Sequence, residues 1–236
     1  MARKNKTNQP DMSEKQRSLI TEFDQRSPVS EQFKTLRTNI QFSSIDRKLK
    51  TIMVTSSNPG EGKSTTVANL AVVMAQQHNR VLLVDTDLRK PTVHFTFQVP
   101  NHVGLSNVVT GQSTLEDAKM ETAIPRLDVL PSGPVPPNPS ELLASRAFEK
   151  FVKSVSDSYD YVIFDAPPVN AVTDPQIIAS LTDGTVLVIR SGVTEIEDAQ
   201  HAVANLKKVE AHLLGTVLND RAVEKSNYYY YYTEGK

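Results

Sequence analysis

The residues Ser57–Thr65 read SNPGEGKST, and they join two segments of different periodicity. The apolar run Thr51–Thr55 before them predicts a strand, and the segment Lys63–Gln77 that they open predicts a helix. Gly60 and Gly62 allow the backbone to bend closely around a ligand, because glycine has no side chain to obstruct it. The amides of such a turn, together with a helix N-terminus, attract anions.

Phosphate is the anion that this turn suits, as in P-loop proteins. Lys63 can reach the β and γ phosphates of a nucleotide, and the Ser64 hydroxyl can bind magnesium. Ser57 stands where the first glycine of the motif is usual, which leaves the Gly-Lys-Ser core intact. The alternative is an ordinary glycine turn with a helix cap. The candidate nucleotide-binding residues are Pro59, Gly60, Glu61, Gly62, Lys63, Ser64 and Thr65.

Two further apolar runs end in acidic residues. Val81–Val84 is followed by Asp85 and Asp87, and Tyr161–Phe164 is followed by Asp165. Because ligands bind outside the carboxyl ends of parallel strands, we expect these carboxylates at the same sheet edge as the phosphate turn. For each aspartate the alternative is a strand-end residue that caps a helix or faces solvent.

Magnesium and phosphate chemistry gives these residues expected roles. Magnesium prefers oxygen ligands and keeps several waters, so we expect Ser64 to bind it directly while Asp85 and Asp165 hold its waters. Phosphoryl transfer also needs a group that orients or deprotonates the nucleophile, and Asp87 remains for that role. Arg89 either neutralises charge in the transition state or pairs with an aspartate. The sequence therefore predicts ATP and Mg²⁺ as cofactors.

The remaining periodicity predicts an α/β fold. Apolar runs without polar alternation are typical of strands buried on both faces of a parallel sheet, and three more occur at Leu127–Leu130, Thr185–Ile189 and Leu213–Leu218. Further helices are expected at Pro28–Phe42, Pro139–Ser156 and Glu195–Val209. The second helix is expected to begin with Asn138 as cap, Pro139 in the first turn and Glu141 in a capping box. This alternation predicts a three-layer P-loop NTPase fold with a mainly parallel central sheet flanked by helices.

Length and composition limit the classes of protein. The 236 residues and 39% hydrophobic content suit one compact domain. We divide the chain into a flexible N-terminal segment 1–27, a P-loop domain 28–226 and a flexible tail 227–236. The net charge of -1 gives no reason to expect direct nucleic-acid binding, and the absence of cysteine excludes disulfides and thiolate metal sites. Neither a signal peptide nor an apolar run of about 20 residues is visible, so we expect a cytoplasmic protein.

The three motifs together resemble those of the bacterial tyrosine kinases, and the resemblance spans residues 28–236. In that family they form the Walker A loop, the Walker A′ motif and the Walker B strand, here Ser57–Ser64, Val81–Arg89 and Tyr161–Pro168. The resemblance implies a protein-tyrosine kinase in which Asp85 and Asp165 serve magnesium and Asp87 approaches the acceptor tyrosine. The candidate catalytic residues are Lys63, Asp85, Asp87 and Arg89.

The resemblance also implies a role for the tyrosine-rich tail. Five consecutive tyrosines near the C-terminus are expected to be autophosphorylated in trans by a neighbouring subunit of a ring. The alternative is a low-complexity end without a role. The candidate acceptors are Tyr228, Tyr229, Tyr230, Tyr231 and Tyr232.

The resemblance implies several partners. A homo-oligomeric ring, such as an octamer, is expected through a helix motif whose counterpart here is Glu31, Lys34 and Arg37. Lysine replaces the middle arginine of that motif and lacks its bidentate geometry, and a solvated charged face is the alternative. The resemblance further implies activation by the cytoplasmic tail of a transmembrane protein linked to exopolysaccharide or capsule production, and recruitment to the inner face of the membrane. It also implies protein substrates such as sugar-nucleotide dehydrogenases.

Two other classes of function are compatible with these motifs. Switch ATPases of partitioning or division sites carry a signature lysine near the start of the loop, where this chain has Asn58. A non-catalytic, nucleotide-dependent scaffold for polysaccharide export would keep the same motifs. In related ATPases an asparagine at the end of such a strand contacts adenine, which is the role expected of Asn219. A turn-forming Asn-Asp pair is the alternative.

Overall fold

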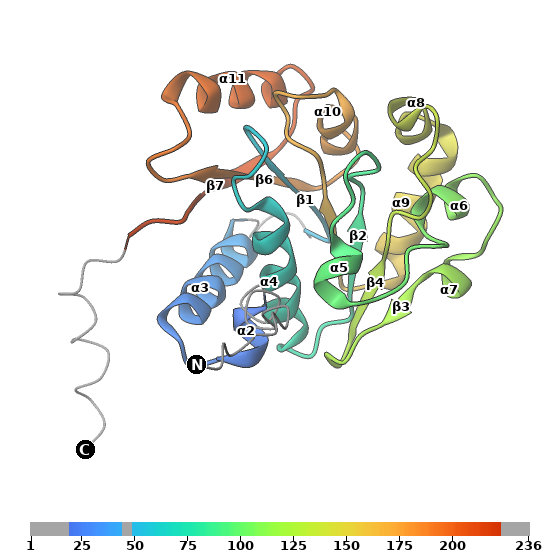
Figure 1. The fold of residues 1–236 in the computed structure, drawn as a ribbon, viewed down its shortest axis with the longest axis horizontal. Helices are drawn as coiled ribbons and strands as arrows, with labels where there is room; N and C mark the ends of the chain where they lie inside the picture. The colour runs from blue at the N-terminus through green and yellow to red at the C-terminus, as the bar shows by residue number, and fades with distance from the viewer. Residues whose placement is uncertain (1–18, 44–48, 223–236) are drawn as a thin grey trace, which may run out of the picture.

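The computed structural model describes residues 19–43 and 49–222. Their central feature is a seven-stranded sheet in the order β3-β4-β2-β5-β1-β6-β7 (Figure 1). Neighbouring strands are parallel, except that β3 and β4 are antiparallel. The strands are β1 (Thr51–Ser56), β2 (Val81–Asp85), β3 (Met120–Glu121), β4 (Leu127–Leu130), β5 (Tyr161–Asp165), β6 (Gly184–Arg190) and β7 (Leu213–Asn219).

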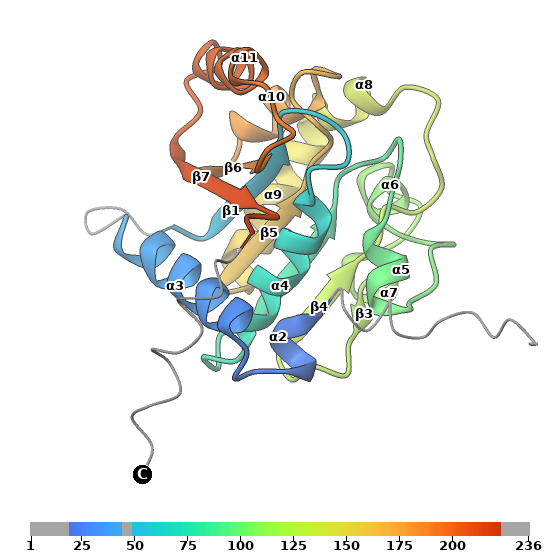
Figure 2. The same ribbon diagram turned by 60° about the vertical axis from the view of Figure 1, so that its left-hand side comes forward.

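Helices cover both faces of this sheet and complete three layers, which confirms the predicted fold class. One face carries α2 (Ile20–Phe23), α3 (Pro28–Phe42) and α4 (Lys63–Ala75), as Figure 2 shows. The other face carries α9 (Arg146–Ser158), α10 (Asp174–Ala179) and α11 (Ile196–Lys207). The short helices are α5 (Val93–Phe97), α6 (Leu105–Val109), α7 (Leu115–Ala118) and α8 (Pro139–Leu143).

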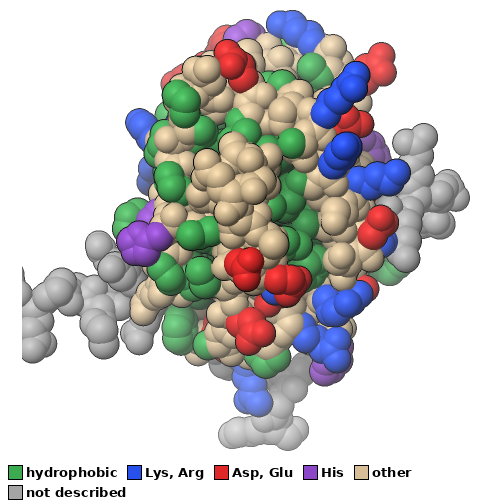
Figure 3. All heavy atoms as spheres, turned by 90° about the vertical axis from the view of Figure 1, so that its right-hand side faces the viewer, with side chains coloured by type: hydrophobic (Ala, Val, Ile, Leu, Met, Phe, Trp, Pro, Cys, Tyr) green, Lys and Arg blue, Asp and Glu red, His purple; other side chains and the backbone are tan. Residues whose placement is uncertain are grey.

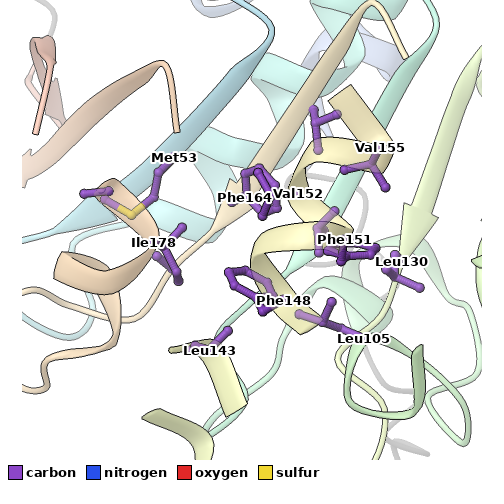
Figure 4. Close-up of a cluster of buried hydrophobic side chains, with 14 of the residues drawn as sticks. Met53, Leu105, Leu130, Leu143, Phe148, Phe151, Val152, Val155, Phe164 and Ile178 are labelled. Carbon is purple, nitrogen blue, oxygen red and sulfur yellow. The ribbon is translucent and has the colours of Figure 1, made fainter. Parts of the chain in front are cut away.

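Side chains of the central strands alternate between two hydrophobic cores. In β1, Ile52 and Val54 pack with α4, whereas Met53 belongs to the cluster under α9 and α10. Figure 4 shows this second cluster, in which Phe148 of α9 lies near Phe164 of β5 with ring centroids 6.5 Å apart. Burial of both faces explains why these strands lack polar alternation, as predicted.

The prediction that Leu213–Leu218 is buried on both faces was wrong. This segment belongs to β7, which is the edge strand of the sheet, and Leu218 remains 48% exposed. The strand itself was predicted within one residue. Its register shifts against β6 between Thr185 and Val186, and Gly215 adopts a φ of 156° close to this irregularity.

The predicted helix Pro139–Ser156 is divided into α8 and α9. Ser145 interrupts it, because its hydroxyl accepts a hydrogen bond from the amide of Phe148 at 3.2 Å and caps a new helix. The predicted cap at Asn138 was also wrong: its side chain makes no cap bond and donates to Glu141 Oε2 at 3.0 Å. Apolar periodicity continues across Ser145, which is why it suggested one helix.

The N-terminal part of the described chain is attached to α4. Within the segment predicted as flexible, residues 20–23 form α2, and the amide and hydroxyl of Thr21 donate to Asn69 Oδ1 at 3.1 and 2.8 Å. Residues 1–18 of that segment lie outside the described residues. These contacts connect α2 to the helix that follows the phosphate turn.

The outer surface carries no uniform charge on the side of α6, α7 and α8. Acidic and basic side chains both occur there, with hydrophobic side chains between them (Figure 3). Among residues 19–43 and 49–222, no helix has the length and apolar character needed to cross a membrane.

Phe148 gives a test of the core. We expect Phe148→Ala to lower the free energy of unfolding by about 3–5 kcal/mol, because this side chain of α9 is fully buried against β5. Urea unfolding measures this change. Phe42→Ala is the matched control, since Phe42 is 68% exposed, and it should stay within about 0.5 kcal/mol. Equal effects of the two substitutions would contradict this assignment of the core.

Candidate nucleotide and phosphoryl-transfer site

The phosphate turn has the predicted conformation. Gly60 and Gly62 adopt left-handed φ angles of 81° and 87°, which favour glycine, and Gly62 is the N-cap of α4. A Cβ atom at Gly62 would collide with Nδ2 of Asn219 at the end of β7. The turn therefore requires glycine here both for its backbone angle and for its neighbour.

Lys63 lies between two carboxylates at the mouth of this turn. Its Nζ is 3.1 Å from Asp165 Oδ1 and 3.2 Å from Asp87 Oδ2, and it donates to Ser64 Oγ at 3.2 Å. Burial alone would lower the pKa of Lys63, but the charges of Asp165 and Asp87 outweigh burial and raise it. The amine is therefore held as a cation, pointing at the sheet edge where the predicted carboxylates meet.

Asp85 and Asp165 are neighbours because β2 and β5 pair in register at their carboxyl ends. Burial, followed by the charge of Asp165, raises the pKa of Asp85 well above its ordinary value. Asp85 Oδ2 accepts the amides of Thr92 and Val93, each at 3.0 Å, and Oδ1 accepts the amide of Asp87 at 3.2 Å. Asp85 thus closes the base of the loop that carries Asp87, a role that the sequence did not reveal.

Two buried oxygen atoms in the site have no partner among the described residues. They are Asp165 Oδ2 and Ser57 Oγ, and both residues are fully buried. Burial raises the pKa of Asp165 even though Lys63 opposes it. An unpaired buried carboxylate oxygen beside the Ser64 hydroxyl is a donor set that suits magnesium. The described part of the chain has no group of three His, Cys, Asp or Glu residues placed to hold a metal by itself, and magnesium commonly relies on waters and substrate phosphates.

The side chain of Glu61 stabilises the turn from inside and does not face outward from it. Its Oε2 accepts the Asn58 amide at 2.9 Å, and its Oε1 accepts the Thr194 hydroxyl at 2.6 Å. Asn219 Nδ2 donates to the Glu61 carbonyl at 3.0 Å, and Asn58 Nδ2 donates to Asp198 at 2.7 Å. These contacts connect the turn to α11 and to the ends of β6 and β7.

Arg89 pairs with an aspartate, one of the two roles considered for it. Nε and Nη2 lie 2.9 and 3.2 Å from the two oxygens of Asp174, which is fully buried at the start of α10. Ser140 Oγ accepts from Arg89 at 2.8 Å and donates to Asp174 at 2.6 Å. Hydrogen bonding to Asp174 raises the pKa of Arg89. Opening this pair would leave the buried Asp174 carboxylate without its cation, so the pair is not readily opened.

Sequence reasoning missed Asp174. The signal that was available is the Thr173-Asp174-Pro175 helix start, which predicts a turn and a helix and says nothing about Arg89. The two residues are 85 positions apart in the chain, and the fold alone brings them together.

The remaining candidate residues lie apart from this cluster. Pro59 and Thr65 are exposed in the turn and at the start of α4. On α3, Lys34 pairs with Glu31 at 2.7 Å, and Arg37 donates to the Val73 carbonyl in the last turn of α4 at 2.8 Å. The ring contact predicted for these three residues of α3 stays a prediction. Tyr228–Tyr232 lie outside the described residues.

Known proteins are similar to this chain in both sequence and fold. Residues 49–218 match the model of a family described as AAA domain. The chain is 50% identical over 220 residues to tyrosine-protein kinase YwqD of Bacillus subtilis (strain 168), covering 93% of each chain. The chain belongs to the bacterial tyrosine kinase family. It is also 41% identical to the putative tyrosine-protein kinase CapB of Staphylococcus aureus, over 89% of this chain and 92% of that protein.

Solved structures agree with this family. The chimerical protein CapA2B2 superposes with a TM-score of 0.85 at 43% identity, covering 88% of this chain and 91% of that one. The kinase domain of Escherichia coli tyrosine kinase ETK gives a TM-score of 0.83 at 30% identity, covering 87% and 82%. The division-site protein MinD of Pyrococcus horikoshii, solved with Mg-ADP, gives 0.62 at 25% identity over 75% of each chain. The family predicted from the three motifs, and with it the kinase class, is confirmed.

The hydrogen bonds of Glu61 give a test of the turn. We expect Glu61→Ala to lower the free energy of unfolding by about 1–3 kcal/mol, because the Asn58 amide loses the buried Glu61 carboxylate as its acceptor. Thr194→Val should weaken the same unit, and the double variant should cost less than the sum of the two. Thr194→Ser keeps the hydroxyl and is the control. Additive losses in urea unfolding would contradict the coupling.

The raised pKa of Asp165 makes stability depend on pH. The folded protein binds this proton more tightly than the unfolded chain, so this contribution to stability falls as pH rises through the raised pKa. At neutral pH, Asp165→Asn removes the unfavourable free energy of burying a charged carboxylate. We therefore expect the variant to have a higher Tm than the wild type at pH 7.5, with a smaller gain near pH 4.

Asp157→Asn is the control for this experiment, because Asp157 is exposed on α9 and the formal charge changes equally. Its Tm should match that of the wild type at both pH values. A lower Tm for Asp165→Asn at neutral pH would show that the ion pair with Lys63 outweighs the cost of burial.

Proposed function

We propose that this kinase binds ATP with magnesium at the site of Lys63 and transfers the terminal phosphate to tyrosine hydroxyls, first to those of its own tail in trans. The proposed acceptors are Tyr228–Tyr232. The observation that carries the proposal is the position of Lys63, held between Asp87 and Asp165 beside a glycine turn built for phosphate. The relatives named as tyrosine-protein kinases support the acceptor class.

The residues of the turn hold the nucleotide in this proposal. The amides of residues 60–65 surround the phosphates, with the N-terminus of α4 contributing positive potential. Asn219 offers Oδ1 to adenine, since its Nδ2 already donates to the Glu61 carbonyl. Ser64 would bind magnesium directly, while Asp85 and the unpaired oxygen of Asp165 would hold its waters. When bound, magnesium neutralises charge on the phosphate oxygens.

Transfer then requires Lys63 to leave the carboxylates of Asp87 and Asp165 and to contact the phosphates of the nucleotide. As Lys63 turns to the β and γ phosphates, Oδ2 of Asp87 loses its cation and becomes available as a base. The tyrosine oxygen attacks the γ phosphorus, and the bond from that phosphorus to the β–γ bridging oxygen breaks. ADP leaves with the electron pair, and the phenolic proton passes to Asp87.

The partners of this kinase form part of the same proposal. Glu31, Lys34 and Arg37 contribute to a homo-oligomeric ring in which one copy phosphorylates the next. Arg37 contacts α4 within its own protomer, so the helix proposed to form the ring packs against the helix that begins at the phosphate turn. The cytoplasmic tail of a transmembrane protein linked to exopolysaccharide or capsule production activates the kinase and recruits it to the inner face of the membrane. Other protein substrates include sugar-nucleotide dehydrogenases.

Labelled ATP tests the proposal. The full chain is incubated with γ-labelled ATP and magnesium, with and without the cytoplasmic tail peptide of the accompanying membrane protein, and label is mapped by peptide. We expect label on Tyr228–Tyr232, and its loss to below about 1% with Lys63→Met, because transfer depends on positioned charge. Asp87→Asn should also abolish most of it, while Lys153→Met, an exposed lysine of α9, should not.

Replacing Tyr228–Tyr232 with phenylalanine separates acceptor from catalyst. ATP binding should persist while self-labelling disappears, and persistent labelling would identify another acceptor. Released inorganic phosphate with unlabelled tyrosine would favour a switch ATPase. Tight nucleotide binding without either product would favour a scaffold.

A further inference from the structure

Arg89 contacts Asp174 with two nitrogen atoms of one edge of its guanidinium group. Nε and Nη2 both face the carboxylate, and Ser140 bridges the pair. Asp174 is fully buried, whereas 39% of the Arg89 side chain remains exposed. A planar guanidinium that meets a carboxylate with two donors fixes orientation as well as distance.

The pair lies at the outer end of the loop that carries Asp87. Asp85 closes the base of this loop through the amides of Asp87, Thr92 and Val93. Asp87 Oδ1 accepts the amide of Lys90 at 3.0 Å, so Arg89 lies inside the turn that Asp87 itself closes. Asp85 and Asp87 therefore hold the loop through its own backbone amides. Arg89 attaches the same loop to the start of α10.

The same contact argues against a direct role for Arg89 in transfer. To reach a phosphate with this edge, Arg89 would leave a fully buried carboxylate without its cation, which is a strongly unfavourable state. Asp87 needs no such change, because its Oδ2 already lies at Lys63. The loop presents Asp87 to the site while Arg89 stays with Asp174.

Resting on the function proposed above, we propose that Asp174 is a positioning residue that acts through Arg89 to hold the loop carrying Asp87 in place. Arg89 is then the anchor of this loop and not a donor to the transferred phosphate. Ser140 at the start of α8 bonds to both partners, so the loop is attached to the first turns of α8 and α10.

A double-mutant cycle on self-labelling tests this inference. Arg89→Ala and Asp174→Asn should each lower kcat by up to about 10²-fold, as expected for a misplaced catalytic group, while the KM for ATP stays within about 2-fold. The double variant should lose no more than the worse single variant, because both substitutions break one unit. Lys90→Ala, an exposed neighbour in the loop, should stay within about 2-fold of the wild type.

Two kinetic results would overturn the inference. If Arg89→Ala abolishes transfer while Asp174→Asn has wild-type kcat, Arg89 acts on the phosphate directly. If the two losses multiply in the double variant, the residues do not act as one unit. Ser140→Ala supplies an intermediate case and should lower kcat less than either single variant.

Hydrogen exchange tests the same inference without any turnover. In Asp174→Asn, the amides of Lys90, Thr92 and Val93 should exchange at least about 10-fold faster than in the wild type, because their carboxylate acceptors hold a loosened loop. Amides of the paired strand β5 serve as the internal control. Unchanged exchange in this loop would refute the anchor even in a protein that transfers no phosphate. Faster exchange without self-labelling would leave the anchor standing and reject the proposed transfer.

Discussion

The site depends on one cation placed among three carboxylates. Register pairing of β2 with β5 puts Asp85 next to Asp165, and the fold adds Asp87 two residues further on. Burial of so much negative charge is unfavourable, as the raised pKa values of Asp85 and Asp165 indicate. Lys63 offsets part of it, and it is the first residue of the helix that the glycine turn begins. Carboxylates outnumber cations in this cluster, and binding of a divalent cation would reduce the repulsion between them.

The loops around this cluster are held by buried carboxylates. Glu61 joins the phosphate turn to the loop after β6, Asp85 joins both ends of the loop after β2, and Asp174 holds the far end of that loop. Each of these side chains is buried and bonded to amides, a hydroxyl or a guanidinium. These contacts hold the loops of the site in position.

Much of this arrangement follows from local signals in the chain. Apolar runs locate the strands, glycines locate the phosphate turn, and parallel pairing brings Asp85, Asp87 and Asp165 to one edge. The Glu61–Thr194 and Arg89–Asp174 contacts have no local signal, because each joins residues far apart in sequence. The helix break at Ser145 did carry a local cap, yet continuous apolar periodicity concealed it. β7 is exposed because it is an edge strand, and the order of strands in a sheet cannot be predicted from the apolar pattern of one strand.

The contact of Asn219 with the phosphate turn has a consequence for the geometry of the tail. Because β7 ends beside this turn, the tail is tethered at the mouth of the site. Tyr228 follows Asn219 by nine residues and Tyr232 follows it by 13. A chain spans at most ~3.5 Å per residue, so these tethers reach no further than ~30 and ~45 Å. In the ring proposed above, those lengths set the largest spacing that still lets a tail reach from one copy's β7 end to the next copy's phosphate turn.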